Sequence, residues 1–213
     1  FPHHENEIAQ SECANGCTFS KFWFHLGFVN INNEKMSKSK NNFFTVRDLA
    51  KIYGYEPLRY FAISGHYRMP VNYEPAVIEQ ARASLDRLYN CADNLDFLCA
   101  NARIKEATAE EKAVLSELSG YKAKFIEAMD DDLNTANGLS VIFDLVRDIT
   151  RAAAEGSHSE EFLTSAKGYL MELCSVLGLL YNQGKKADDG EAAEIEKLIE
   201  ERQAARKAKD FKE

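Results

Sequence analysis

The chain has 213 residues, of which 45% are hydrophobic and 28% charged, and a formal net charge of −8. These values are ordinary for one large or two small globular domains, and no apolar run approaches the roughly 20 residues that a membrane-spanning helix needs. The acidic balance argues against a broad nucleic-acid-binding surface but not against a local basic stripe, and the odd count of five cysteines favours reduced thiols and a cytoplasmic protein.

The first part of the chain is predicted to mix helix and strand. Pro2 suits the first turn of a helix, because its missing N–H has no partner there, and we expect that helix to run to about Cys13. Residues 24–31 alternate enough to predict a strand. The remaining signals here are a turn at Asn32-Asn33, a polar loop over residues 35–42 and a helix start at Thr45, with Asp48 in its first turn.

The second part is predicted to be helical throughout. All four prolines lie at or before Pro75, and the later sequence is rich in Ala, Leu and Glu. The sequence therefore predicts a boundary near 71–75 and three segments: 1–74, 75–182 and 183–213. The first two expected helices cover residues 76–102 and 108–129, the second starting with a capping box of Thr108 and Glu111. A third lies around residues 139–149, and a fourth, capped by Ser157 with Glu160, runs to about Leu180. A last helix follows a linker at residues 182–190.

His3 and Glu7 are the first pair that could carry chemistry. On a helix, residues four apart lie one turn apart on the same face, so an imidazole and a carboxylate at this spacing can ligate one metal ion such as zinc. Such a site needs two more ligands, and Cys13 and Cys17 are near in sequence. The competing interpretation is a solvated polar start of a helix.

The lysine-rich stretch Lys35-Met36-Ser37-Lys38-Ser39 follows the predicted strand. Two lysines three residues apart on a loop can grip a polyphosphate, each as a mobile point charge. Such charges could also stabilise the negative charge that builds up on departing pyrophosphate. The competing interpretation is an ordinary exposed basic loop.

Two further groups of basic residues could bind RNA. Arg59 and Arg68, with His66 and Tyr67, combine base-stacking and phosphate-binding side chains, although we favour the interpretation that they are arginines at an ordinary domain junction. In the last predicted helix one face carries Arg202, Arg206 and Lys209. That face could meet an anionic partner, or it could be a solvated face that nearby acidic residues neutralise.

Together these residues resemble one family, the cysteinyl-tRNA synthetases. Residues 1–11 are similar to a family signature, Trp23, His25 and Gly27 follow at its spacing, and residues 35–39 match the KMSKS loop of class I aminoacyl-tRNA synthetases. The pattern continues through residues 58–68 and, more loosely, in residues 130–136 and 202–211, which resemble the DALR-type helical region. Lys40-Asn41 departs from the Leu-Gly that is usual after the KMSKS run.

The resemblance implies a fold and an activity. The fold would be mixed. The first part would be the end of a class I catalytic domain, which is a partial α/β domain with the KMSKS loop and the stem-contact region. An all-α bundle of DALR type and the start of a C-terminal tRNA-binding helix would follow. The activity would be that of a cysteine–tRNA ligase, which joins cysteine to ATP (with Mg²⁺), releases pyrophosphate and passes the cysteinyl group to tRNA(Cys). We expect the enzyme to act as a monomer.

The resemblance also assigns roles to single residues. His3 and Glu7 match two of the family's four zinc ligands, whose other two are cysteines upstream of this chain, and zinc selects cysteine by binding its thiolate. Lys38 matches the ATP-contacting lysine, with Lys35 in support. The chain lacks the HIGH motif, so we expect it to be a fragment that is inactive by itself. Two alternatives compete: a helical tRNA-binding module without catalysis, and a related cysteine ligase that uses no tRNA.

Overall fold

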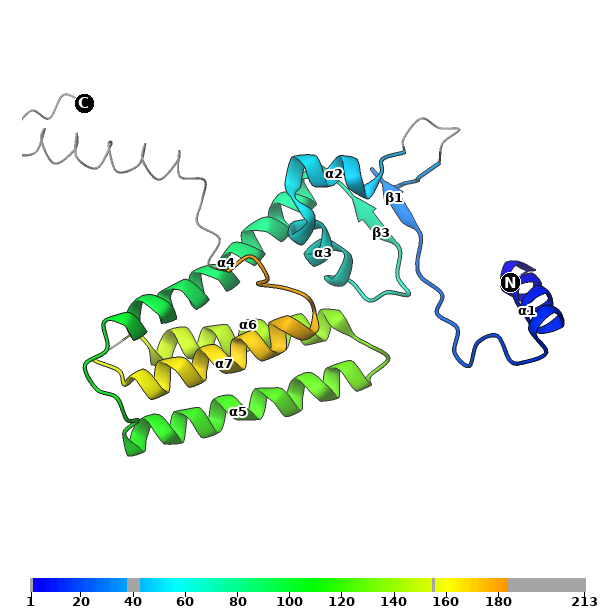
Figure 1. The fold of residues 1–213 in the computed structure, drawn as a ribbon. Helices are drawn as coiled ribbons and strands as arrows, with labels where there is room; N and C mark the ends of the chain where they lie inside the picture. Colours follow the sequence, from blue (N-terminus) through cyan, green and yellow to red (C-terminus); the bar gives the residue numbers. More distant parts are fainter. Residues whose placement is uncertain (1, 38–42, 155, 184–213) are drawn as a thin grey trace, which may run out of the picture. The chain divides into compact units, whose positions relative to one another are not determined.

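The computed structural model describes residues 2–37, 43–154 and 156–183 (Figure 1). Contacts along the chain divide it into two compact units, residues 1–179 and 180–213, and the fold described here is that of the first. Within the described residues, no helix combines the length and apolar character needed to cross a membrane. The last predicted helix, over the far end of the chain, lies outside the described residues.

The first part of the chain is mixed, as the sequence predicts. It contains a three-stranded sheet in the order β2-β1-β3, with β1 antiparallel to β2 and parallel to β3. Its elements are α1 (Pro2–Asn15), β1 (Val29–Ile31), β2 (Glu34–Lys35), α2 (Val46–Tyr53), α3 (Tyr55–Ile63) and β3 (Val71–Tyr73). Thr45 caps α2 by accepting a hydrogen bond from the Asp48 N–H, which confirms that prediction.

The small sheet follows from two backbone requirements. Asn32 and Asn33 both have left-handed backbones, with φ of 50° and 64°, which is what a two-residue hairpin turn between antiparallel strands demands. The parallel pair β1 and β3 cannot be joined by a tight turn, and α2 and α3 form the crossover between them. Ile31 and Tyr73 pack with Ile78 in the core beneath.

The predicted strand over residues 24–31 is wrong in its extent, because regular pairing begins only at Val29. Residues 24–28 run beside 66–70, but Pro70 has no N–H to donate to a ladder. Only single hydrogen bonds remain there, from the Gly27 N–H to the Tyr67 carbonyl and from the Val71 N–H to the Phe28 carbonyl, both 2.8 Å. Helix α1 also continues two residues past its expected end, to Asn15.

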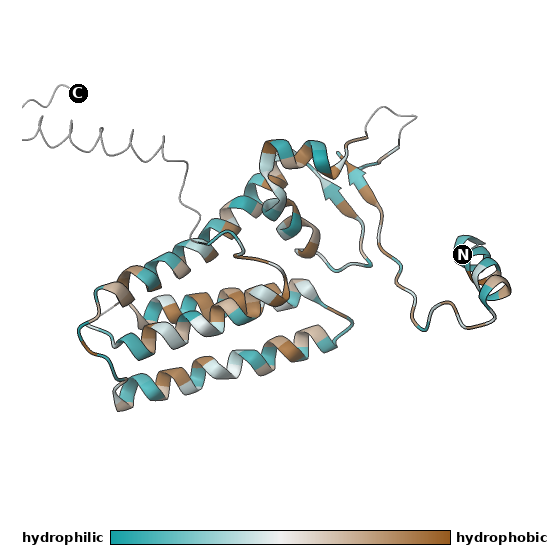
Figure 2. Ribbon diagram, viewed as in Figure 1, coloured by the Kyte–Doolittle hydropathy of each residue, from teal (hydrophilic) through white to brown (hydrophobic). Residues whose placement is uncertain are grey.

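The second part is a bundle of helices, as predicted (Figures 1 and 2). Its helices are α4 (Pro75–Ala100), α5 (Ala109–Asp130), α6 (Thr135–Ala152) and α7 (Glu160–Val176). Apolar positions recur along each helix (Figure 2), and the fully buried ones include Leu88, Ile142 and Leu170. Since the N-terminal turn of α4 supplies Ile78 to the core beneath the sheet, one helix takes part in both cores.

The helix ends of the bundle show one prediction confirmed and two corrected. Thr108 and Glu111 form the predicted capping box of α5. Helix α7 is capped by Ser159 rather than Ser157, because the buried Ser159 hydroxyl accepts from the Phe162 N–H while donating to Glu111. Helix α7 ends at Val176, whereas the prediction extended it to about Leu180. Gly178, just past the end of the helix, turns the chain with φ of 67°.

All five cysteines belong to the described residues, and none forms a disulfide. Cys13 and Cys17 are exposed, whereas Cys91 and Cys174 are buried in the bundle. Burial raises the pKa of the Cys91 thiol, and it raises the pKa of Cys174 to about 12. The two buried thiols are therefore neutral, and they pack as small apolar groups.

Glu111 ties the start of α5 to the start of α7. Its carboxylate accepts hydrogen bonds from the Thr108 N–H at 2.9 Å, the Ser159 N–H at 3.0 Å and the Ser159 hydroxyl at 2.8 Å. Burial alone would raise the pKa of Glu111, but these hydrogen bonds, with one from His158, hold the pKa below its ordinary value of 4.5. The ionised carboxylate is thus the form that the fold requires.

We predict that Glu111→Ala lowers the free energy of unfolding by roughly 1–3 kcal/mol, because it leaves the buried groups of Ser159 without an acceptor. Urea unfolding followed by circular dichroism measures this, and Glu110→Ala, on the exposed side of the same turn, is the matched control. Because folding lowers the pKa of Glu111, the stabilisation that this carboxylate gives should be complete above pH 4.5. It should fade as the pH falls through the pKa of Glu111 in the folded state. Equal stability of the two variants would contradict the assignment.

Candidate functional site

The β1–β2 hairpin places the lysine-rich stretch at the edge of the sheet. Lys35 ends β2 and pairs in register with Asn30 of β1, and its Nζ lies 4.5 Å from the centroid of the Phe28 ring. The turn is held to the neighbouring strand, because the Asn33 N–H donates to the Asn72 side-chain oxygen at 2.8 Å. Lys38, the residue with the predicted ATP contact, lies outside the described residues.

Two apolar side chains, one before and one after the undescribed residues 38–42, line a common cavity. Met36, within the stretch, and Phe44, beyond its end, line the same apolar cavity of about 210 Å³, which Leu49 and Phe61 also bound. The Phe44 ring additionally lies 6.1 Å from that of Tyr73. Described residues on both sides of 38–42 therefore contact the sheet and the crossover helices through apolar side chains.

His3 and Glu7 lie on α1 at the predicted spacing, and both are exposed. Cys13 and Cys17 are separated by the end of the helix, where Gly16 takes φ of 66°. Among the residues that the structure describes, no three His, Cys, Asp or Glu side chains gather closely enough to hold a metal ion. His3 and Glu7, both described, are two of the four zinc ligands that the resemblance implies.

His4, rather than His3, contacts the rest of the first part. Its ring centroid lies 5.5 Å from that of Trp23 and 5.1 Å from that of His25. Trp23 in turn approaches Phe19 at 5.8 Å. The sequence indicated Trp23 and His25 as family positions, but nothing in its spacing indicated that His4 would join them.

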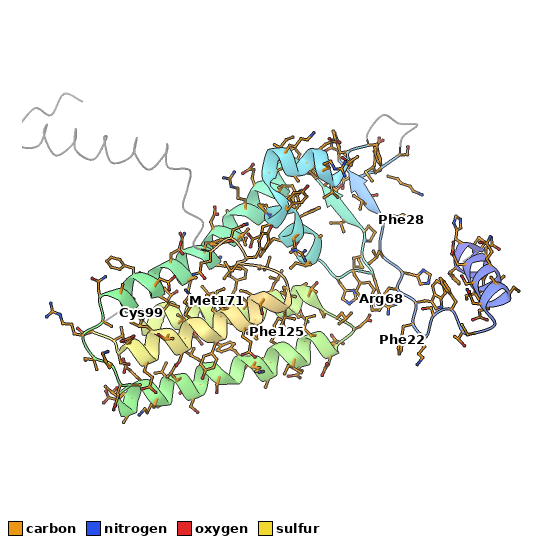
Figure 3. The ribbon with its side chains drawn as sticks, viewed as in Figure 1. Phe22, Phe28, Arg68, Cys99, Phe125 and Met171 are labelled. Atoms are coloured by element: carbon orange, nitrogen blue, oxygen red, sulfur yellow. The ribbon has the colours of Figure 1, made fainter. Side chains whose placement is uncertain are left out.

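Arg68 reaches from the loop between α3 and β3 to the turn between α5 and α6 (Figure 3). Its Nε donates to Asp132 Oδ2 at 2.6 Å and its Nη2 to Oδ1 at 3.2 Å, and the Tyr67 hydroxyl donates to Oδ1 at 2.7 Å. His66 Nε2 lies 3.7 Å from the same carboxylate. Hydrogen bonds from Arg68 and then Tyr67 lower the pKa of Asp132 to about 2.

Arg59 also faces the helical part. A Cβ added at Gly178, just past α7, would lie 3.0 Å from Arg59 Nη1, so the guanidinium covers that turn closely. One turn away, the buried Glu56 accepts a hydrogen bond from the Tyr89 hydroxyl of α4 at 2.7 Å. Arg59 and Arg68, both proposed RNA contacts, thus lie where the mixed part meets the bundle; their role in RNA binding stays a prediction. Arg202, Arg206 and Lys209 lie outside the described residues.

A groove of about 630 Å³ between α4 and α6 was not anticipated. Its basic residues are Arg87 from α4 and Arg147 and Arg151 from α6. Arg147 pairs with Asp144 at 2.7 Å, and Asp148 pairs with both arginines of α6. The spacing of Arg147 and Arg151, four residues apart on one helix, was the signal available in the sequence, but their pairing with these aspartates reduces the net positive charge.

Comparisons with known proteins match two domain families in order along the chain. Residues 1–83 match the family described as tRNA synthetases class I (C) catalytic domain, and residues 124–181 match the DALR domain. A protein of Caldicellulosiruptor saccharolyticus named cysteine–tRNA ligase is 51% identical over 100% of this chain and 45% of its own length. One of the same name from Clostridioides difficile is 49% identical over 99% of the chain and 44% of its own length.

A solved structure shows the same type of fold at lower similarity. The LeuRS chain of a ternary complex with tRNA and LeuAMS, from Agrobacterium radiobacter K84, superposes with a TM-score of 0.58 at 17% identity, over 71% of this chain and 20% of that one. Our chain spans less than half the length of the curated relatives that it matches. From the identity of about 50% over the whole of this chain, and from the catalytic-domain and DALR matches in order along it, the chain belongs to the cysteine–tRNA ligase family.

Proposed function

We propose that this chain works as one part of a longer cysteine–tRNA ligase, which activates cysteine with ATP and transfers it to tRNA(Cys). The observation that carries the proposal is the identity of about 50% to two proteins of that name over essentially the whole chain. The two matched domains support a division of labour. Residues 1–74 would serve the chemistry of ATP, and residues 75–182 and 183–213 would serve tRNA.

The lysine-rich stretch is the part that we assign to ATP. In the activation step the cysteine carboxylate attacks the α-phosphorus of ATP, the bond to the β-phosphate oxygen breaks, and pyrophosphate leaves with its electron pair. Lys38, supported by Lys35, would neutralise the charge that gathers on pyrophosphate. The position of Lys35, which pairs with Asn30 and lies beside the Phe28 ring, supports this role, because a charge that is already positioned costs little reorganisation when the reaction occurs.

The zinc and tRNA assignments are finer proposals. His3 and Glu7 would contribute two zinc ligands, completed by cysteines that this chain does not contain. Arg202, Arg206 and Lys209 are the proposed tRNA contacts at the far end of the chain, with Arg59 and Arg68 next. Arg68 already donates to Asp132, and the Arg59 guanidinium lies close to Gly178, so tRNA contacts there would be additional to a structural role. The five unpaired thiols support a reducing, cytoplasmic setting.

We predict that a full-length ligase carrying this sequence catalyses cysteine-dependent ATP–pyrophosphate exchange and that the 213-residue chain alone does not. Removing parts of a preorganised site costs orders of magnitude in rate each. Exchange by the full-length protein with serine in place of cysteine is the specificity control. Exchange by the chain alone, or none by the full-length protein, would overturn the proposal. Binding of tRNA without exchange by either protein would favour a tRNA-binding module.

We predict that Lys38→Ala in the full-length ligase lowers kcat for exchange by about 10²–10³-fold, the cost of losing one positioned group that stabilises the transition state. KM for cysteine should change by less than about twofold, since the lysine acts on the leaving group. Lys51→Ala, on α2 and 72% exposed, is the matched control and should leave both constants unchanged. A rise in KM for ATP with kcat intact would reduce Lys38 to a ground-state contact.

We predict that the isolated chain holds zinc only weakly, because two ligands leave the ion largely hydrated. Metal analysis after exhaustive dialysis should give far less than one zinc per chain, and His3→Ala should not change the result. One tightly held zinc per chain, lost in Cys13→Ser/Cys17→Ser, would show that the exposed cysteines complete a site after all.

A further inference from the structure

The turn between α5 and α6 is held in an unusual backbone conformation. Asp132 and Leu133 are consecutive, and both are left-handed, with φ of 56° and 53°. A non-glycine residue in this region is uncommon, and a leucine there is strained. Hydrogen bonds close the turn on both sides, from the Leu133 N–H to the Met129 carbonyl at 3.0 Å and from the Thr135 N–H to the Leu133 carbonyl at 2.8 Å. Strain of this kind persists only where the surroundings over-determine it.

What surrounds Asp132 is the loop from α3 to β3. Arg68 and Tyr67 place three hydrogen bonds on its carboxylate, at 2.6, 2.7 and 3.2 Å. The donors also hold one another, because the Tyr67 ring stacks on His66 at 4.8 Å and the Arg68 guanidinium lies 5.3 Å from the Tyr67 centroid. We call the set of His66, Tyr67, Arg68 and Asp132 the Asp132 latch. It joins the helical part to a loop of the mixed part.

That loop lies directly against the residues that lead into β1. The Tyr67 carbonyl accepts from the Gly27 N–H at 2.8 Å, and the Tyr67 ring lies 5.3 Å from that of Phe24. A Cβ added at Gly27 would come within 2.1 Å of the Met69 carbonyl oxygen, so no side chain can stand there without moving one backbone. Residues 24–28 are therefore positioned by the loop, although they form no regular ladder with it.

From there the connection to the lysine-rich stretch is short. Phe28 precedes β1, its ring lies 4.5 Å from Lys35 Nζ, and β1 pairs with β2, which ends at Lys35. A displacement of residues 66–70 would thus move β1 and the hairpin with it. The path from Asp132 to Lys35 consists of hydrogen bonds and ring contacts between consecutive, packed segments.

We propose that Asp132, a residue of the helical part, is a positioning residue that fixes the lysine-bearing hairpin through Tyr67, Arg68 and the close approach of Gly27 to Met69. The inference rests on the proposed function, since it concerns the rate at which the lysines assist departure of pyrophosphate. Asp132 touches no reacting atom. Its carboxylate holds the loop, the loop holds β1, and β1 sets where the hairpin begins.

The test uses a full-length ligase carrying this sequence. Asp132→Asn retains shape and tolerates a left-handed backbone, but it removes the charge that the latch donors surround. It should lower kcat for cysteine-dependent exchange by about 10- to 100-fold, the cost of a displacement of about 1 Å at a reacting group, and leave KM for cysteine within about twofold. Arg68→Ala should do the same, and the double variant should lose no more than either single variant, because both break one unit.

Glu172→Gln is the matched control. It removes the exposed pair of Lys122 with Glu172, also 2.6 Å long, between α5 and α7 and away from residues 66–70, so exchange should not change. If Asp132→Asn does not fold, Tyr67→Phe removes a single hydroxyl from the latch and should still lower kcat. An unchanged kcat in whichever of these variants folds would overturn the inference. So would a loss of kcat in the double variant equal to the product of the two single losses. In either case, exchange by the wild-type ligase would still uphold the proposed function.

Discussion

The parallel pairing of β1 with β3 is the constraint on which the arrangement of the described chain depends. Parallel strands require a crossover, and here it supplies α2 and α3, whose apolar residues cover the sheet. Helix α4 begins with Pro75, directly after β3. The bundle therefore starts from the sheet without a linker, and the direction of β3 sets where α4 and the helices packed on it can lie.

Much of this arrangement could be predicted from local signals. The caps at Thr45 and Thr108 and the Asn32-Asn33 turn depend on residues close in sequence, whose own side chains or backbones satisfy the hydrogen bonds. The change from a mixed first part to a helical second part followed from composition. The predictions that were wrong depended on residues distant in sequence. Pro70 interrupts the pairing of the strand before Val29. Ser159 caps α7 in place of Ser157 because Glu111 accepts a hydrogen bond from the Ser159 hydroxyl.

The candidate site shows the same distinction. The spacing of His3 and Glu7 on one face of a helix followed from helical geometry, and the structure has it. That Arg68 would meet Asp132, far along the chain, could not follow from periodicity, because a carboxylate in a turn gives no sign of which arginine will reach it. Arg59 and Arg68 lie at the junction of the two parts, as the favoured interpretation of their sequence expects, and their contact with RNA stays a prediction.

The burial of Cys91 and Cys174 has a consequence for chemical modification. The thiolate is the nucleophile that attacks thiol reagents, and burial keeps both thiols protonated, with the pKa of Cys174 raised to about 12. Cys13 and Cys17, at the end of α1 and just beyond it, are exposed. A maleimide-linked fluorophore therefore attaches first beside α1, next to the helix that carries His3 and Glu7. The fluorescence of such a label would report on that helix, and the two buried cysteines of the bundle would stay unmodified.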